Sequence, residues 1–122
     1  MSRRIYLMER TRKTWGEKWT IFQNDLCEVS VLYLRPKQRC SWHDHRSKYN
    51  LFFTIEGHLR IKLDDGVSVG ISEVGKNQIF TTRPGEWHEF QTAEEETIII
   101  EIMFVKYDPE DIIRDKVGGP IK

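Results

Sequence analysis

The stretch that decides the fold is "SWHDHRSKYNLFFTIEG", residues 41–57, where two histidines precede a run of strand-forming residues. His43 and His45 stand two residues apart, so an extended backbone places both imidazoles on one face. Asn50 follows five residues later and shares a strand face with Phe52. This spacing indicates a metal site built between strands, although Asn50 offers an amide where a carboxylate would be the stronger ligand.

A second stretch, "RPGEWHEF" at residues 83–90, supplies a third histidine. A Pro-Gly turn leads into His88, which opens a strand whose next residue on the same face is Phe90. If these faces line the interior of one barrel, His88 converges with His43 and His45. Three imidazoles near one point suit a divalent transition metal, so we expect zinc, iron, manganese or nickel as a cofactor.

Runs with a period of two residues dominate the rest of the chain. Turns rich in Gly, Pro, Asn and Asp separate them, and "LDDG" at residues 63–66 is a good hairpin signal. Many short strands at regular spacing predict an all-β sandwich or barrel. The predicted strands are residues 19–23, 27–34, 50–55, 58–63, 67–72, 78–82, 88–92 and 97–106.

Length and charge narrow the class of protein. The 122 residues suit one domain, and a hydrophobic fraction of 39% favours a folded chain. Nineteen basic and nineteen acidic residues cancel, so no net field attracts nucleic acid. No stretch has the apolar length of a membrane span or the pattern of a signal peptide. We expect a cytoplasmic protein without nucleic-acid or membrane partners.

The first stretch resembles the first motif of the cupin superfamily. That motif is a histidine, any residue, a histidine, three or four residues, a glutamate, six residues and a glycine. His43, His45 and Gly57 match it, and Asn50 stands at the position of the glutamate. The resemblance implies that the two histidines, and Asn50 with them, belong to the metal-binding set.

The second stretch resembles the second cupin motif, a proline, a spacer, a glycine, two residues and a histidine. His88 matches the metal-binding histidine, with the proline displaced by one position to Pro84. Together the two motifs imply an all-β cupin fold, a double-stranded β-helix or jelly-roll barrel. We expect one cupin domain over residues 1–122, with a core at about 15–107 and a short helical turn and tail over 108–122.

A narrower similarity relates most of the chain to the cupin domain of type II mannose-6-phosphate isomerases. It rests on the Trp15-Gly16 pair, the two histidine stretches, Arg46 shortly after the histidines, and the closing "DIIR" at residues 111–114. This similarity implies a sugar phosphate or another small anion as the ligand, an isomerase-like activity and a role in carbohydrate metabolism.

The amide at Asn50 leaves three functions open. A metal ion held by neutral ligands keeps its full charge, so the site would favour a small anionic ligand. Arg46 and Lys48 would bind that anion, and Phe52 and Phe90 would line the pocket, although solvated charges and core aromatics explain the same residues. The chain would be a metal-dependent isomerase-like enzyme, a non-catalytic cupin that binds a small molecule, or a three-histidine metal dioxygenase.

Glu101 stands alone among isoleucines in the predicted strand 97–106. An interior carboxylate needs a partner, so we expect Glu101 to be a paired structural group. The alternative is that it replaces the missing carboxylate as an acid–base group. No catalytic residue is assigned from the sequence.

The strand that follows the histidines is apolar on both faces. Leu51, Phe53 and Ile55 point away from the face that carries Asn50. Small barrels commonly cover such surfaces with a second copy. We therefore expect a homodimer.

Overall fold

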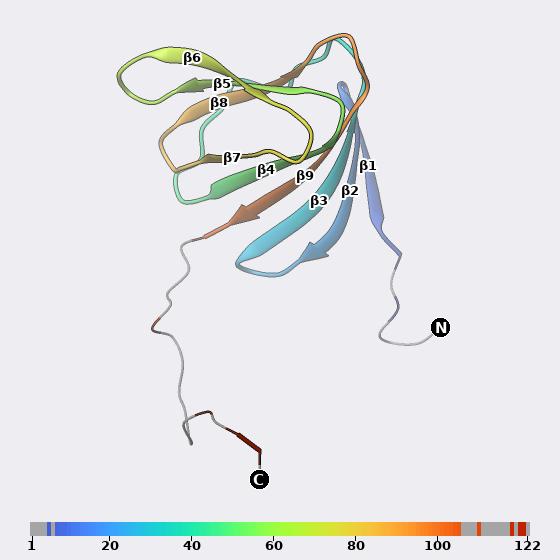
Figure 1. Ribbon diagram of the computed structural model, residues 1–122, viewed down its shortest axis with the longest axis vertical. Coiled ribbons are helices and arrows are strands. Elements are labelled where there is room, and N and C mark those ends of the chain that lie inside the picture. Colours follow the sequence, from blue (N-terminus) through green and yellow to red (C-terminus); the bar gives the residue numbers. More distant parts are fainter. Residues whose placement is uncertain (1–4, 6, 106–109, 111–117, 119, 122) are drawn as a thin grey trace.

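The computed structural model describes residues 5, 7–105, 110, 118, 120 and 121, and every regular element within them is a β-strand. A six-stranded sheet has the order β1-β2-β3-β9-β4-β7, and a three-stranded sheet has the order β6-β5-β8. Figure 1 shows the smaller sheet facing part of the larger one, with β1 on the side away from β6. The strands are β1 (Glu9–Lys13), β2 (Gly16–Gln23), β3 (Cys27–Leu34), β4 (Tyr49–Glu56), β5 (Leu59–Asp64), β6 (Val69–Val74), β7 (Ile79–Thr82), β8 (Trp87–Thr92) and β9 (Thr97–Phe104).

All neighbouring strands run antiparallel, and the predicted all-β jelly-roll class is confirmed. Each of the eight predicted strands corresponds to one of β2 to β9, with ends that differ by up to three residues. The predicted hairpin is present, since Asp64 pairs with Val69 across the turn. The expected helical turn and tail over 108–122 lie almost entirely outside the described residues. None of the described residues forms a helix suited to crossing a membrane.

The strand β1 was not predicted. Its residues, "ERTRK", are all polar and all exposed, so they carry no alternation of apolar and polar side chains. The strand nevertheless pairs with β2 over its full length as the outer edge of the larger sheet. A charged edge strand of this kind discourages further strands from pairing with it.

The hydrophobic core fills the space between the two sheets. Alternate residues of β3, β4, β5, β8 and β9 point inward, as the period of two requires. The ring of Trp15 meets the ring of Phe90 edge to face, with centroids 5.2 Å apart. Full burial of each large apolar side chain contributes about 1.5–3 kcal/mol. The core consists of Trp15, Leu32, Leu34, Phe52, Leu59, Ile61, Val74, Phe90 and Ile99.

The connection between β3 and β4 runs along β8 and closes one side of the barrel. Cys40 donates its backbone N–H to the carbonyl of Phe90 at 3.1 Å. Further along, His43 and His88 form an antiparallel bridge and exchange two backbone hydrogen bonds, of 3.1 and 2.8 Å. The connection therefore acts as an irregular fourth strand of the smaller sheet.

Gly57, in the turn between β4 and β5, is required for steric reasons. Its φ is +83°, and an added Cβ would lie 2.6 Å from Thr97 Oγ1 and would also meet the carbonyl of Glu96. Gly66 has a φ of +90° but nothing within 4 Å of such a Cβ. We expect Gly57→Ala to lower the free energy of unfolding by about 3 kcal/mol and Gly66→Ala by about 1 kcal/mol, in urea titrations at 25 °C. Equal losses would contradict the steric argument.

Candidate metal centre

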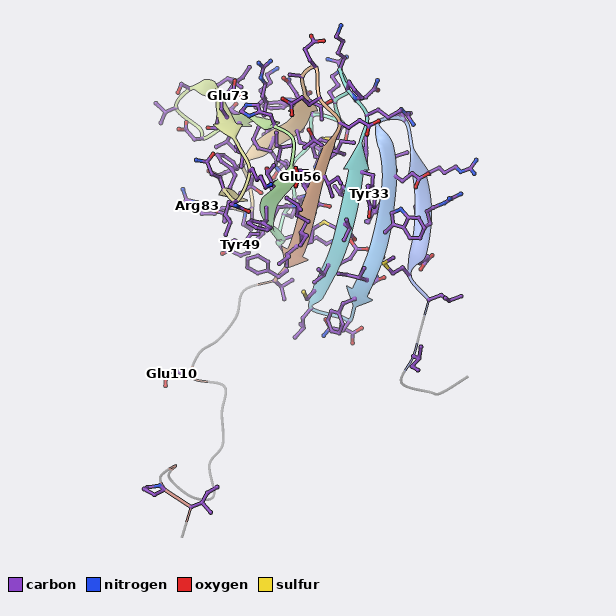
Figure 2. All side chains as sticks on the ribbon, turned by 45° about the vertical axis from the view of Figure 1, so that its right-hand side comes forward. Tyr33, Tyr49, Glu56, Glu73, Arg83 and Glu110 are labelled. Atoms are coloured by element: carbon purple, nitrogen blue, oxygen red, sulfur yellow. The ribbon has the colours of Figure 1, made fainter. Side chains whose placement is uncertain are left out.

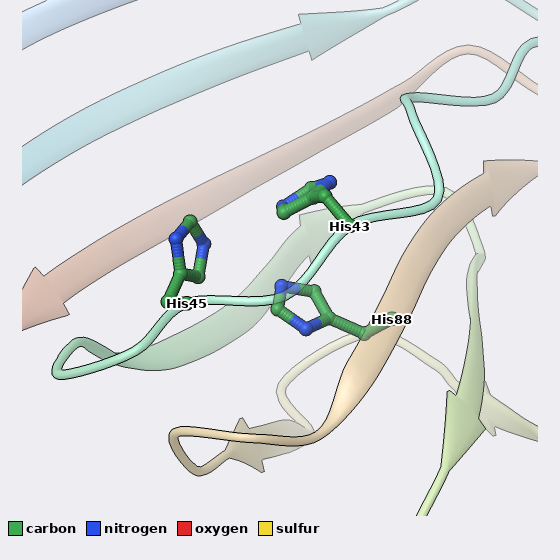
Figure 3. Close-up of side chains that lie close together, drawn as sticks. All are labelled: His43, His45 and His88. Atoms are coloured by element: carbon green, nitrogen blue, oxygen red, sulfur yellow. The ribbon is translucent and has the colours of Figure 1, made fainter.

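Three histidines from two separate segments meet at the end of the barrel. His43 and His45 lie in the connection before β4, and His88 is the second residue of β8. One ring nitrogen of each lies within 4.8 Å of the others. The ring centroids are 4.5 Å apart for His43 and His88, 5.0 Å for His43 and His45, and 5.4 Å for His45 and His88. Figure 3 shows the three side chains facing a common space, as the spacing in the sequence predicted.

The backbone holds the two histidine stretches together. The bridge between the two main chains holds His43 beside His88. The turn before β8 holds the segment that carries His45. The N–H of Gly85 lies 3.0 Å from the carbonyl oxygen of His45 and 3.0 Å from Asp44 Oδ1. Gly85 has a φ of +86°, which glycine adopts without strain. The Pro-Gly turn of the second stretch therefore positions the first stretch.

Hydrogen bonds to the outer ring nitrogens set the tautomers. His88 Nδ1 lies 2.9 Å from the carbonyl of Glu86, and His43 Nδ1 lies 2.7 Å from the carbonyl of Ser41. A carbonyl only accepts, so each Nδ1 carries the proton and each Nε2 keeps a free lone pair. Metal-binding histidines are oriented in the same way.

The inner ring nitrogens lack partners. The Nε2 atoms of His45 and His88 are buried and have no hydrogen-bond partner among the described residues. A buried polar atom without a partner is costly, and such atoms are rare in folded proteins. Clustered lone pairs without a donor between them are the arrangement that a transition metal satisfies. The residues present therefore fit a metal ion.

The local environment keeps two of the imidazoles neutral. Burial lowers the pKa of His88, and the repulsion from His43 lowers it further, against an opposing hydrogen bond to Glu86. Burial also lowers the pKa of His45, with added repulsion from His43, His88 and Lys48. Neutral imidazole is the form that binds metal, so both side chains are ready to act as ligands near pH 7.

The two predicted aromatic residues lie in the core. Phe52 is 1% exposed, and its ring centroid lies 6.2 Å from that of His88. Phe90 is 5% exposed and packs against Phe52 and Trp15. Phe52 therefore contacts the histidine cluster directly, whereas Phe90 supports it from one layer deeper. Their role in binding a ligand stays a prediction.

The two predicted cations are at the surface. Both Arg46 and Lys48 are exposed, in the turn that follows the histidines. Lys48 lies close enough to His45 to lower the pKa of that ring. It also lines a hollow of about 240 Å³ beside the turn between β2 and β3 and the end of β9, together with Glu28 and Met103. None of the three histidines lines this hollow.

Asn50 points into the barrel, where it is 1% exposed. Its Oδ1 accepts a long hydrogen bond of 3.4 Å from Thr82 Oγ1. Its Nδ2 donates to Glu101 Oε2 at 3.3 Å. Both ends of the amide therefore have partners within the protein, and the role of Asn50 as a metal ligand stays a prediction.

Glu101 belongs to an interior set of polar residues that the sequence only partly revealed. It lies on β9 directly between Ser30 and Phe52, and burial raises its pKa to about 7. The attraction of Lys18 lowers the pKa and the repulsion of Glu28 raises it. Lys18 and Glu28 form an ion pair of 3.1 Å. The sequence did not lead us to predict either residue as part of this interior set. Glu28 could have been found, because it shares the inward face of β3 with buried residues.

Two facing antiparallel sheets and a histidine cluster at the barrel end define the class of protein. The chain is a cupin. Within that class, residues 27–114 match the family described as the AraC-like ligand binding domain, and the chain belongs to this family. No curated protein sequence matches the chain.

Solved structures share the fold at low sequence identity. KdgF from Halomonas sp. has a TM-score of 0.70 and 9% identity, over 82% of this chain and 88% of that one. A variant of oxalate decarboxylase from Bacillus subtilis has a TM-score of 0.71 and 16% identity, over 80% and 27%. CapF has a TM-score of 0.71 and 19% identity, over 86% and 32%. The chain thus spans about a third or less of the last two proteins. A further structure of that decarboxylase describes Mn(II) centres.

The raised pKa of Glu101 makes the stability of the fold depend on pH. Its carboxyl pKa lies at about 7 in the folded chain and at an ordinary 4.5 when unfolded, so the native state favours the protonated form. Stability should therefore fall as the pH rises from 4.5 through 7. We expect Glu101→Gln to leave urea unfolding almost unchanged at pH 5 and to stabilise the chain by about 2 kcal/mol at pH 8.5.

The matched control for this change is Glu56→Gln, because Glu56 is exposed at the end of β4. It should alter the unfolding free energy by only a few tenths of a kcal/mol at either pH. A Glu101→Gln variant with the same stability difference at pH 5 and at pH 8.5 would contradict the assignment.

Proposed function

We propose that the chain is a metal-binding cupin that holds a divalent transition metal with His43, His45 and His88 and receives a small anionic ligand there. The observation that carries the proposal is the pair of buried Nε2 atoms, on His45 and His88, that have no partner among the described residues. They face the same space as the His43 ring. Imidazole suits zinc, iron and nickel. The Mn(II) centres of the similar oxalate decarboxylase add manganese to the proposed metals.

The charge around the site supports an anionic ligand. A divalent ion held by three neutral imidazoles keeps its full positive charge, and it would polarise a carbonyl or phosphoryl oxygen as a Lewis acid. Lys48 lies near His45, and Arg46 is exposed in the same turn. These two cations would bind the charged end of the ligand. The similarity to type II mannose-6-phosphate isomerases suggests a sugar phosphate.

Asn50 is the proposed fourth member of the metal-binding set. Its oxygen is held only by the 3.4 Å hydrogen bond from Thr82, which is long for an O–H donor. A metal ion would replace this weak contact while Nδ2 continues to donate to Glu101. An amide oxygen adds no charge, so we expect weaker metal binding than a glutamate would give.

The metal content of the purified chain tests the proposal. We expect one transition metal per chain, measured by mass spectrometry after purification without added ions, and a loss of at least roughly 100-fold in metal affinity in His88→Ala. His58→Ala is the control, because His58 lies at a turn and pairs with Glu73. It should keep the metal.

The measurements of metal content and metal affinity do not require any catalytic activity of the chain. A metal-free wild-type chain, or equal metal loss in both variants, would overturn the proposal. Circular dichroism melts of both variants show whether the barrel is intact, and addition of metal should raise the melting temperature of the wild type and of His58→Ala but not that of His88→Ala.

A non-catalytic ligand-binding module is the favoured form of this function. The family is described by ligand binding, and no carboxylate lies in the histidine cluster among the described residues. The cluster itself therefore supplies no carboxylate as a general base, and Glu101 contacts the site only through Asn50. An isomerase-like enzyme rests on the similarity of the histidine stretches and the Trp15-Gly16 pair. A three-histidine dioxygenase needs no carboxylate ligand and is the third candidate.

Binding and turnover can be separated with mannose 6-phosphate as the probe. We expect calorimetry on the metal-loaded chain to detect binding that Lys48→Ala weakens roughly 5- to 20-fold, because one ion contact is lost. Lys76→Ala is the control, since Lys76 pairs with Glu56 away from the site. Binding without conversion supports the module, and conversion to another sugar phosphate supports the enzyme. No binding would exclude mannose 6-phosphate as the ligand.

A further inference from the structure

The outer face of the larger sheet, on β2, β3, β9, β4 and β7, is apolar and points away from the smaller sheet. The register sets one residue from each of these five strands in a row, namely Ile79, Phe53, Ile100, Val31 and Trp19. The neighbouring rows add Leu51, Ile102 and Val29 on one side and Ile98 and Tyr33 on the other. Directly opposite residues in a sheet point to the same side, so these side chains form one surface.

This outer face has no cover among the described strands. In Figure 2 the strands β9, β3, β2 and β1 lie side by side with no other strand in front of them, and Tyr33 is labelled on β3. Tyr33 is 44% exposed and Ile79 is 59% exposed. Ile98, Ile100 and Ile102 are half-buried, although their neighbour Ile99 on the opposite side of β9 is fully buried. The outer face therefore leaves apolar side chains in water.

The size of the outer face fits the centre of a protein interface. Strands lie about 4.8 Å apart and alternate residues about 6.8 Å apart, so each residue of the face occupies about 33 Å² and the ten apolar residues named above cover roughly 330 Å². A patch of that size lies within the range of about 300–600 Å² for the largest apolar patch of a monomer, and such patches are often functional. A stable interface buries about 800 Å² per partner, with an apolar centre and a polar rim. The outer face supplies such a centre.

The rim supplies charges of both signs. Arg10 and Arg12 lie beside the face on β1. Glu17 and Glu56 lie at the two ends of the row that holds Ile98 and Tyr33. The whole chain has a formal net charge of zero, so two copies do not repel each other at long range. Sheet faces of this shape pack on one another at about 10 Å, and a two-fold axis makes one patch complementary to itself.

We propose that the outer face is a homodimer interface, in which the larger sheets of two copies pack face to face around Ile100. The proposal does not rest on the metal centre, because His88 adjoins Phe52 on the buried, inward face of β4. The apolar residues on both faces of β4 predicted a homodimer, and this proposal identifies the surface through which the two copies would pack.

The test is the solution mass of the full chain by sedimentation velocity and light scattering. We expect a species of twice the 14.6 kDa chain mass at micromolar concentration. Ile100→Glu should raise the dimer dissociation constant by roughly 100-fold or more, because a charge at the centre of the interface is buried without a partner. Ile71→Glu is the matched control, since Ile71 is 57% exposed on β6 of the smaller sheet. That control should remain dimeric.

A second variant covers the case in which Ile100→Glu fails to fold. Tyr33→Glu changes an already exposed side chain on the outer face, and circular dichroism shows whether the variant is folded. A folded Tyr33→Glu monomer supports the proposal. A wild-type chain that stays monomeric overturns it, whatever then covers the face, and so does a dimer that Ile71→Glu disrupts while Ile100→Glu and Tyr33→Glu leave it intact.

Discussion

The two hydrogen bonds that His43 and His88 exchange through their main chains join the parts of this barrel that the site needs. They hold the connection between β3 and β4 against β8, and they bring two imidazole rings to a centroid distance of 4.5 Å in an edge-to-face arrangement. Both bonds use backbone atoms, so they form whatever side chains the two positions carry. The barrel can therefore keep its shape while the chemistry at its end changes, and the fold alone does not fix the function.

The sequence predicted the convergence of the histidines because it depends on two local rules, the period of two and the Pro-Gly turn before His88. It did not predict the contact between Asn50 and Glu101, which joins residues 51 positions apart and depends on how β4 and β9 pair. The strand β1 was missed for another reason. Its five polar residues resemble a loop until β2 offers them a partner.

The carboxylate of Glu101 gives a structural reason for the amide at Asn50. A carboxylate at position 50 would lie against the Glu101 carboxylate, and two such groups in a buried site resist ionising together. An amide instead donates a hydrogen bond to Glu101 and accepts one from Thr82. The departure from the cupin pattern therefore has a structural reason inside the barrel, whatever it does to the affinity for metal.

The position of Glu101 also protects the sheet against strand slippage. Isoleucines occupy both faces of β9, so hydrophobicity alone hardly distinguishes its native pairing from one displaced by a single residue. Such a displacement would turn Ile100 and Ile102 inward and move the Glu101 carboxylate onto the apolar outer face, away from Asn50. The displaced sheet would lose the hydrogen bond between Asn50 and Glu101, and it would place a charge at the centre of the proposed interface. Only the native alignment of β9 leaves the outer face apolar for a second copy.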